Sequence, residues 1–133
     1  NGMLVAYITE IDKVIFTDTD LEVIIDTENI DIKKGEKITV HVDAEKLEVT
    51  NDKVKALHEA DALTVTADST TIKASTGGVT VTRGGSGLKK TLDDMLTAIQ
   101  ALTVTTPHGP SSTPINSAKF ASIQADLPNY LEG

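Results

Sequence analysis

A short repeat, with a period of about eight residues, runs from Asp20 to Gly85. Each unit carries two apolar residues two positions apart, followed by a turn-prone group rich in Asp, Asn, Gly, Ser or Glu. Such period-two alternation predicts β-strands with one buried face. Strands this short cannot form a core alone, so the repeat predicts a stack whose core comes from neighbouring coils or from other copies of the chain.

Composition also favours a narrow β stack over a broad globular core. Among 133 residues, aromatic side chains are 3%, Trp is absent, and most apolar side chains are Val, Ile, Leu and Ala. The net charge of -8 provides no basic face for nucleic acid or an anionic membrane surface. The sequence has no Cys for disulfides, and no apolar run approaches the roughly 20 residues of a membrane span. The opening Asn1-Gly2, in place of Met, indicates a fragment of a longer protein.

Three segments are predicted along the chain. Residues 1–19 should hold two strands that lead into the repeat. Residues 20–85 should form the β-helix shaft, in which the apolar phase slips at residues 54–57 and 70–74. Such a slip is typical of a bulge or bend. Residues 86–133 should form a cap made of a helix, a proline-rich loop and a second helix.

The phase of the repeat predicts which shaft residues face inward. Apolar residues at the alternating positions should point to the interior, and their neighbours Thr39, Glu48, Thr64 and Thr80 should face out. The expected core positions are Ile38, Val40, Leu47, Val49, Leu63, Val65, Val79 and Val81.

The period changes after the glycine-rich residues 84–87. Apolar residues then recur at intervals of four, three, four and three, which predicts a helix with a heptad-type seam and Ser86 as its N-cap. The seam has two interpretations: a three-helix cluster on a trimer axis, or helices packed back against the base of the shaft. Its residues are Leu88, Leu92, Met95, Ile99 and Leu102.

A second helix is predicted over residues 117–126, after a loop at residues 103–115 that holds three of the four prolines. Asn116 is its best N-cap candidate, and Pro128 should end it. Three apolar residues of this helix should share one face: Phe120, Ile123 and Leu127.

We find no catalytic or cofactor signature in the sequence. The glycines at 84–87 lack a following Gly-Lys-Ser/Thr, and no Gly-x-Ser-x-Gly elbow is present, so we expect a linker there and no enzyme. The acidic residues recur at the turn phase, where solvated corners block edge-to-edge aggregation. Calcium binding at these corners is an alternative, although no Asp-x-Asp-x-Asp-Gly run appears.

The three histidines differ in their expected positions. His41 lies between two inward positions and should face out. His58 should face inward if Val54 and Ala56 do, and three copies around an axis could then hold water, an anion or a metal. His108 should be solvated in the proline-rich loop, with a ligand role at the tip as the alternative.

Three stretches resemble the central spike proteins of contractile-tailed bacteriophages and related contractile injection systems. The strand repeat LTVTADSTTIKASTGGVTVT resembles the repeats of that family's β-helix. The opening NGMLVAYITEIDKVIF resembles the last strand of the small oligonucleotide/oligosaccharide-binding barrel that precedes it. The tail LTVTTPHGPSSTPINSAKFASI is similar to the stretch that closes many phage tail and baseplate proteins.

This resemblance implies a mainly β fold, an intertwined homotrimeric β-helix with a C-terminal helical segment. It further implies a structural, non-enzymatic part of a baseplate spike that transmits force for penetration of the host envelope. Its partners would be two further copies, other baseplate or tail subunits and the host cell envelope, with no nucleic acid, and its location the virion. The family's His-x-His pair is absent, so a metal-loaded tip is not expected, and neither is a cofactor.

The alternative from another class is a receptor- or carbohydrate-binding fibre tip. It would need exposed aromatic rings to stack on sugars, and the chain offers Tyr7, Phe16, Phe120 and Tyr130. A polysaccharide-cleaving β-helix is a third possibility, but it needs a groove along a longer solenoid.

Overall fold

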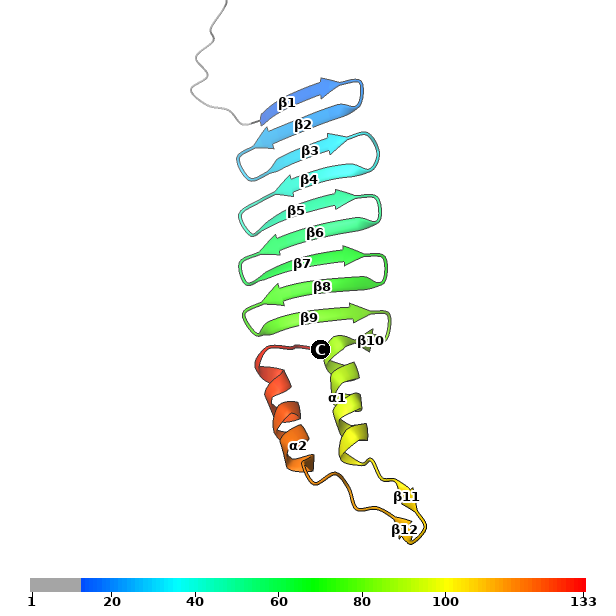
Figure 1. Cartoon of the computed structure of the whole chain (residues 1–133). Helices are drawn as coiled ribbons and strands as arrows, with labels where there is room; N and C mark the ends of the chain where they lie inside the picture. The colour runs from blue at the N-terminus through cyan, green and yellow to red at the C-terminus, as the bar shows by residue number, and fades with distance from the viewer. Residues whose placement is uncertain (1–12) are drawn as a thin grey trace, which may run out of the picture. The chain divides into compact units, whose positions relative to one another are not determined.

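The structure is a computed structural model that describes residues 13–133. It is mainly β, with two helices towards the C-terminus, as the sequence predicts (Figure 1). The chain divides into two compact units, Asn1–Ala60 and Asp61–Gly133. The first of the two strands expected within residues 1–19 lies outside the described residues.

In its described part, residues 13–60, the first unit contains six antiparallel strands, each of which pairs with the next along the sequence. Every connection is a tight turn, so the strands form a simple meander (Figure 1). The strands are β1 (Lys13–Asp18), β2 (Leu21–Asp26), β3 (Ile30–Lys34), β4 (Ile38–Val42), β5 (Lys46–Asn51) and β6 (Val54–Glu59).

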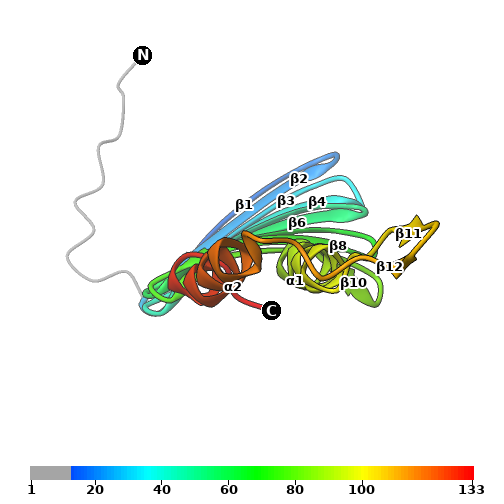
Figure 2. The ribbon, with the colours of Figure 1, turned by 60° about the horizontal axis from the view of Figure 1, so that its bottom comes forward.

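The second unit continues with antiparallel strands and ends in helices. Its helices lie side by side (Figure 2). Its elements are β7 (Ala62–Ala67), β8 (Thr70–Ser75), β9 (Gly78–Arg83), β10 (Ser86–Gly87), α1 (Leu88–Gln100), β11 (Thr105–Thr106), β12 (Gly109–Pro110), α2 (Ser117–Asp126) and the 3-10 helix η1 (Leu127–Asn129).

The bulges predicted at residues 54–57 and 70–74 are wrong, because the ladders of β5–β6, β7–β8 and β8–β9 are continuous. The apolar phase shifts for a simpler reason. A two-residue turn pairs Asn51 with Val54, so the last residue of one strand shares a face with the first residue of the next. Inward positions therefore change between even and odd places at most turns, although not across the three-residue turn between Ile32 and Val40, and the true repeat is a hairpin of two strands.

Three of the two-residue turns use the left-handed backbone region. Asp52, Asp68 and Gly84 are each the first residue of a two-residue turn, with φ of 51°, 52° and 57°. Glycine enters this region without steric cost, and Asp tolerates it better than most residues do. These Asp residues thus shape the turns besides being solvated corners.

Both predicted helices are present, but α1 differs from its prediction at both ends. Its seam was expected to run to Leu102, whereas the helix ends at Gln100. Ser86 belongs to β10, and the N-cap of α1 is Gly87, which makes no side-chain capping bond. The second helix spans Ser117–Asp126 as predicted, with Asn116 at its N-cap. The proline-rich loop contains a short hairpin, β11–β12, where no regular structure was predicted.

The C-terminal residues cover part of the free edge of β9. The Val79 amide donates to the Tyr130 carbonyl (2.8 Å), and the Glu132 amide donates to the Val79 carbonyl (3.1 Å). Leu131 forms a parallel bridge with Val79, and the Ser75 hydroxyl donates to the Glu132 carboxylate (2.8 Å). Together with β10, this C-terminal strap satisfies backbone groups that an open edge strand would leave unpaired.

Substitution at Asp68 tests the turn geometry. Asp68→Val places a β-branched residue in the left-handed region and should lower the free energy of unfolding by about 1–2 kcal/mol. Asp68→Gly should leave the stability within a few tenths of a kcal/mol of the parent or raise it. Chemical denaturation measures both, with Ser69→Val as the control, because Ser69 has no positive φ. Equal losses for Asp68→Val and Ser69→Val would contradict the assigned turn.

Gly78 offers a test of the strap. A Cβ on Gly78 would lie 2.7 Å from the Tyr130 carbonyl oxygen, and the residue has a φ of 143°. Gly78→Ala should therefore displace the strap and destabilise the second unit by about 1–3 kcal/mol. Hydrogen exchange should show faster exchange at the Val79 amide. Gly85→Ala is the control, because a Cβ there meets no atom within 4 Å, and an equal effect of both changes would refute this account.

Candidate assembly surface

The strand register of the first unit places its apolar side chains on one face. Cross-strand partners share a face of an antiparallel sheet, and side chains two apart along a strand do too. The middle position of each strand on this face is apolar, and these residues oppose one another without a break. This central column consists of Phe16, Val23, Ile32, Val40, Val49 and Ala56.

The second unit repeats the arrangement. Val65 opposes Ile72, and Ile72 opposes Val81, so these three form its central column. Leu63, Ala74 and Val79 make an apolar column beside it on the same face.

Nothing in the described chain covers these apolar faces. Phe16 is 62% exposed and Ile72 is 51% exposed, although both lie mid-strand. Among residues 13–133, three hydrophobic side chains are classed as buried, namely Leu96, Leu127 and Leu131, and all belong to the C-terminal part. The sheet of each unit is thus a single layer whose apolar face has no partner within its unit.

The structure places the eight expected core residues as follows. Ile38, Val40, Leu47 and Val49 share the apolar face of the first unit. The other four, Leu63, Val65, Val79 and Val81, share the apolar face of the second. Thr39 and Glu48, and likewise Thr64 and Thr80, lie on the opposite faces. None of the eight is buried in the single chain.

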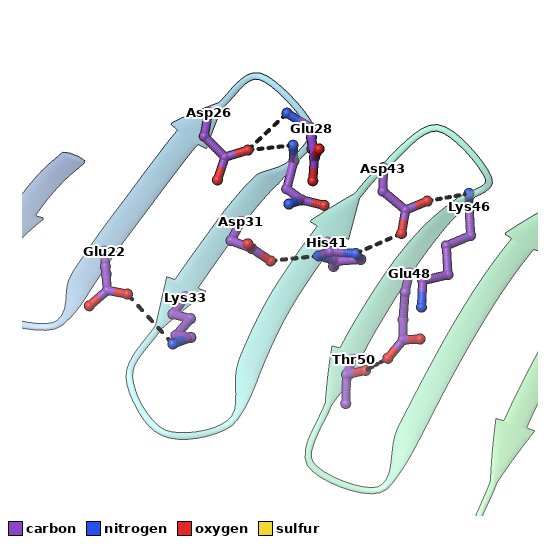
Figure 3. A network of polar contacts seen from close by, with 11 residues as sticks. Glu22, Asp26, Glu28, Asp31, Lys33, His41, Asp43, Lys46, Glu48 and Thr50 are labelled. Atoms are coloured by element: carbon purple, nitrogen blue, oxygen red, sulfur yellow. Dashed lines mark hydrogen bonds and ion pairs between the residues drawn. The ribbon is translucent and has the colours of Figure 1, made fainter. Parts of the chain in front are cut away.

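The opposite face of the first unit is polar and carries a network of ion pairs (Figure 3). His41 lies between two carboxylates, with Nδ1 2.6 Å from Asp31 and Nε2 3.0 Å from Asp43. These hydrogen bonds, the one to Asp31 foremost, raise the pKa of His41 above 6.5. Nearby, the Lys55 ammonium lies 2.7 Å from the Glu48 carboxylate, and this ion pair lowers the pKa of Glu48.

Asp43 and Asp26 also close the turns that follow their strands. The Asp43 carboxylate accepts from the Glu45 amide (2.8 Å) and the Lys46 amide (2.9 Å). The Glu45 amide, with help from His41, lowers the pKa of Asp43 to about 2. The Asp26 carboxylate accepts in the same way from the Glu28 and Asn29 amides of the next turn, and these hydrogen bonds lower the pKa of Asp26.

His58 and His108 lie elsewhere. His58 opposes Leu47, which puts it on the apolar face, where a ring of copies was predicted to hold an ion or water. His108 lies at the exposed turn between β11 and β12. Within the described residues, no group of three His, Cys, Asp or Glu side chains is placed to hold a metal ion.

Only part of the predicted helical seam packs against α2. Leu92 packs with Phe120 against the buried cluster of Leu96, Leu127 and Leu131. Leu88, Met95 and Leu102 remain exposed. Ile123, expected on the packed face of α2, is 41% exposed.

Hollows in the first unit lie beside hairpin turns. Three of them have volumes of about 370, 400 and 420 Å³ and are open to solvent. They are lined by turn residues and by the strand ends beside them, and none of the three brings a Ser or Thr hydroxyl together with a His base. We therefore take the apolar faces as the candidate functional surface.

No protein-family model, curated protein or solved structure matches this chain. Within residues 13–133, the helices are too short and too polar to cross a membrane.

The histidine network predicts how stability depends on pH. His41 has a folded pKa above its unfolded value, so its contribution is complete below about pH 6.5 and is lost as the pH rises through the raised pKa. Asp43 stabilises the folded unit above about pH 4, and this stabilisation is lost as the pH falls towards 2. The first unit should therefore be most stable between these limits.

Thermal unfolding between pH 6 and pH 9 should show a fall in midpoint that His41→Asn removes. His58→Asn, a change outside the network, should retain the fall. Titration of the His41 ring by NMR should give a midpoint above 6.5 that Asp31→Asn lowers, because Asp31 is the largest cause of the shift. A midpoint at or below 6.5 in the parent protein would disprove the network.

Proposed function

We propose that the chain is a structural, non-catalytic segment of the central spike of a contractile phage tail or a related injection system. Three copies close their apolar faces around one axis as a three-sided β shaft. The described strands pair with their neighbours in the same chain, so each chain supplies one side of the shaft in place of the intertwined β-helix that the resemblance implies. The observation that carries the proposal is the unbroken central column of apolar side chains on a single-layer sheet. Such a face must be covered, and a second and third copy offer an identical one.

Strand length supports a three-sided shaft. Strands of six residues span about 20 Å at about 3.4 Å per residue. In a triangle with sides of about 20 Å the axis lies about 6 Å from each side, close to half the roughly 10 Å between packed sheets. Val- and Ile-sized side chains in the central column would thus meet at the axis without leaving a channel.

Polar side chains at one margin of the apolar face favour three sides over a two-sheet sandwich. In the first unit, Lys34 and Asn51 lie on this face beside turns, and Arg83 has the corresponding place in the second unit. A sandwich would cover this margin and take Arg83 and the Lys34–Asp20 ion pair out of water, which is costly. At the corner of a triangular prism the same side chains can reach water.

The proposed spike works as a stiff rod. Successive strands add hydrogen-bonded ladders, and a load along the stack presses these ladders and the apolar columns together. The charge of -8 keeps the surface soluble and repels nucleic acid. In this role the partners are other baseplate or tail subunits and the host cell envelope, and the location is the virion.

The receptor- or carbohydrate-binding alternative has less support. Phe120 packs against the cluster of the helical end, so its ring is not free to stack on a sugar. Tyr130 is 50% exposed, but its backbone belongs to the strap. Phe16 is exposed on the apolar face that the trimer would cover.

Sedimentation equilibrium tests the assembly. The parent should have three times the 14.1 kDa chain mass. Val65→Asp places three carboxylates near the axis and should abolish the trimer, because like charges in a desolvated site repel. Thr64→Asp, on the opposite face of the same strand, should leave it intact. A folded monomer, or a dimer, would overturn the three-sided shaft.

Electron microscopy of labelled particles tests the role. An epitope inserted at the exposed β11–β12 turn should appear at the central tip of contractile particles from the source cell. Label on peripheral fibres instead would favour the receptor-binding alternative.

A further inference from the structure

Helix α1 carries two apolar stripes, and α2 covers one of them. Leu96 is buried against α2, and the Gln100 side chain donates to that of Gln124 at 2.8 Å across the same contact. At about 100° per residue, Met95 lies about 100° around the helix from Leu96. Met95 is 50% exposed and Leu102 is 60% exposed. The second stripe thus consists of Leu88 and Met95 on the helix, and the exposed Leu102 follows at the same spacing, two residues beyond the last helical residue, Gln100.

The surroundings of this exposed stripe suit helix packing. Half-buried Ile99 supplies an intermediate heptad position beside it, while Leu92, the other intermediate position, packs against the cluster that α2 covers. Thr91 and Ala98, which flank it, are small and permit close approach of another helix. The charged pair Lys90–Asp94, joined at 2.7 Å, lies well away from Met95 around the helix.

The apolar face of the sheet continues into the helical pair. Leu131 forms a bridge with Val79, so it adjoins the apolar face of β9, and it is buried together with Leu96. Gly87, the N-cap of α1, still belongs to β10, so no linker separates the sheet from the helix. Copies that meet through the sheet would therefore hold their α1 helices close to one another.

We propose that the exposed stripe of α1 packs against the same stripe of two further copies, in a parallel three-helix core with α2 outside. The inference rests on the proposed trimeric shaft and gives its helical end a role in the assembly. A coiled coil of about two heptads would be marginal alone. The shaft brings three α1 helices close together and sets their number. Contact between the stripes then removes three large apolar side chains per chain from water.

Site-specific cross-linking tests this core, because the parent chain has no Cys. Met95→Cys, treated with a short-armed tris-maleimide, should give covalent trimers as the main product on a denaturing gel. Lys90→Cys, exposed and about 140° away around the helix, should give at least tenfold less. Leu102→Cys provides a second stripe position in case Met95→Cys fails to fold.

Sedimentation of the same variants separates the two proposals. Trimers that cross-link through Met95 or Leu102, but not through Lys90, support the three-helix core. Trimers that cross-link equally from all three positions, or from none, overturn the core and leave the spike proposal standing. Monomeric protein overturns both.

Discussion

Burial of one apolar face is the constraint on which the rest of this structure depends. A large apolar side chain gains roughly 1.5–3 kcal/mol when it leaves water. Here such side chains recur at the middle of the strands from β1 to β9, with Ala56 of β6 as the exception, yet Val65 is 37% exposed and Phe16 is 62% exposed. Hydrogen-bonded ladders alone give a strand little net stability. Folding of the strands should therefore be coupled to assembly and should depend on protein concentration.

The sequence sufficed to predict which residues share a face, because period-two alternation is a local property. It also located α2, whose residues lie between Asn116 and Pro128. It failed at residues 54–57 because we read a change of phase as a bulge. In a solenoid, successive strands keep one phase. In a meander with two-residue turns, the phase alternates between neighbouring strands, and the same letters fit a continuous ladder.

Local sequence patterns could not predict contacts between residues that are far apart in the chain. The Asp31–His41 pair depends on the register of the β3–β4 hairpin, and a different turn length would put His41 opposite another residue. A count outward from Glu36, the middle residue of the turn, could have suggested this pair. The strap is harder, because no sequence signal links Leu131 to Val79. Burial of Leu96 in place of Met95 likewise depends on the side from which α2 approaches.

Regular repeats leave one problem that the irregular end of the chain can solve. In the proposed trimer, a chain displaced by one hairpin of sixteen residues would still set Val and Ile against Val and Ile, because the central column changes little along its length. Features that occur once in the chain penalise such a displacement. The strap at Val79 and the stripe of α1 each occur once, at the end of the second unit. Three copies can bring their α1 stripes together only when their strands are aligned, so the helical end would fix the register that the repeat leaves open.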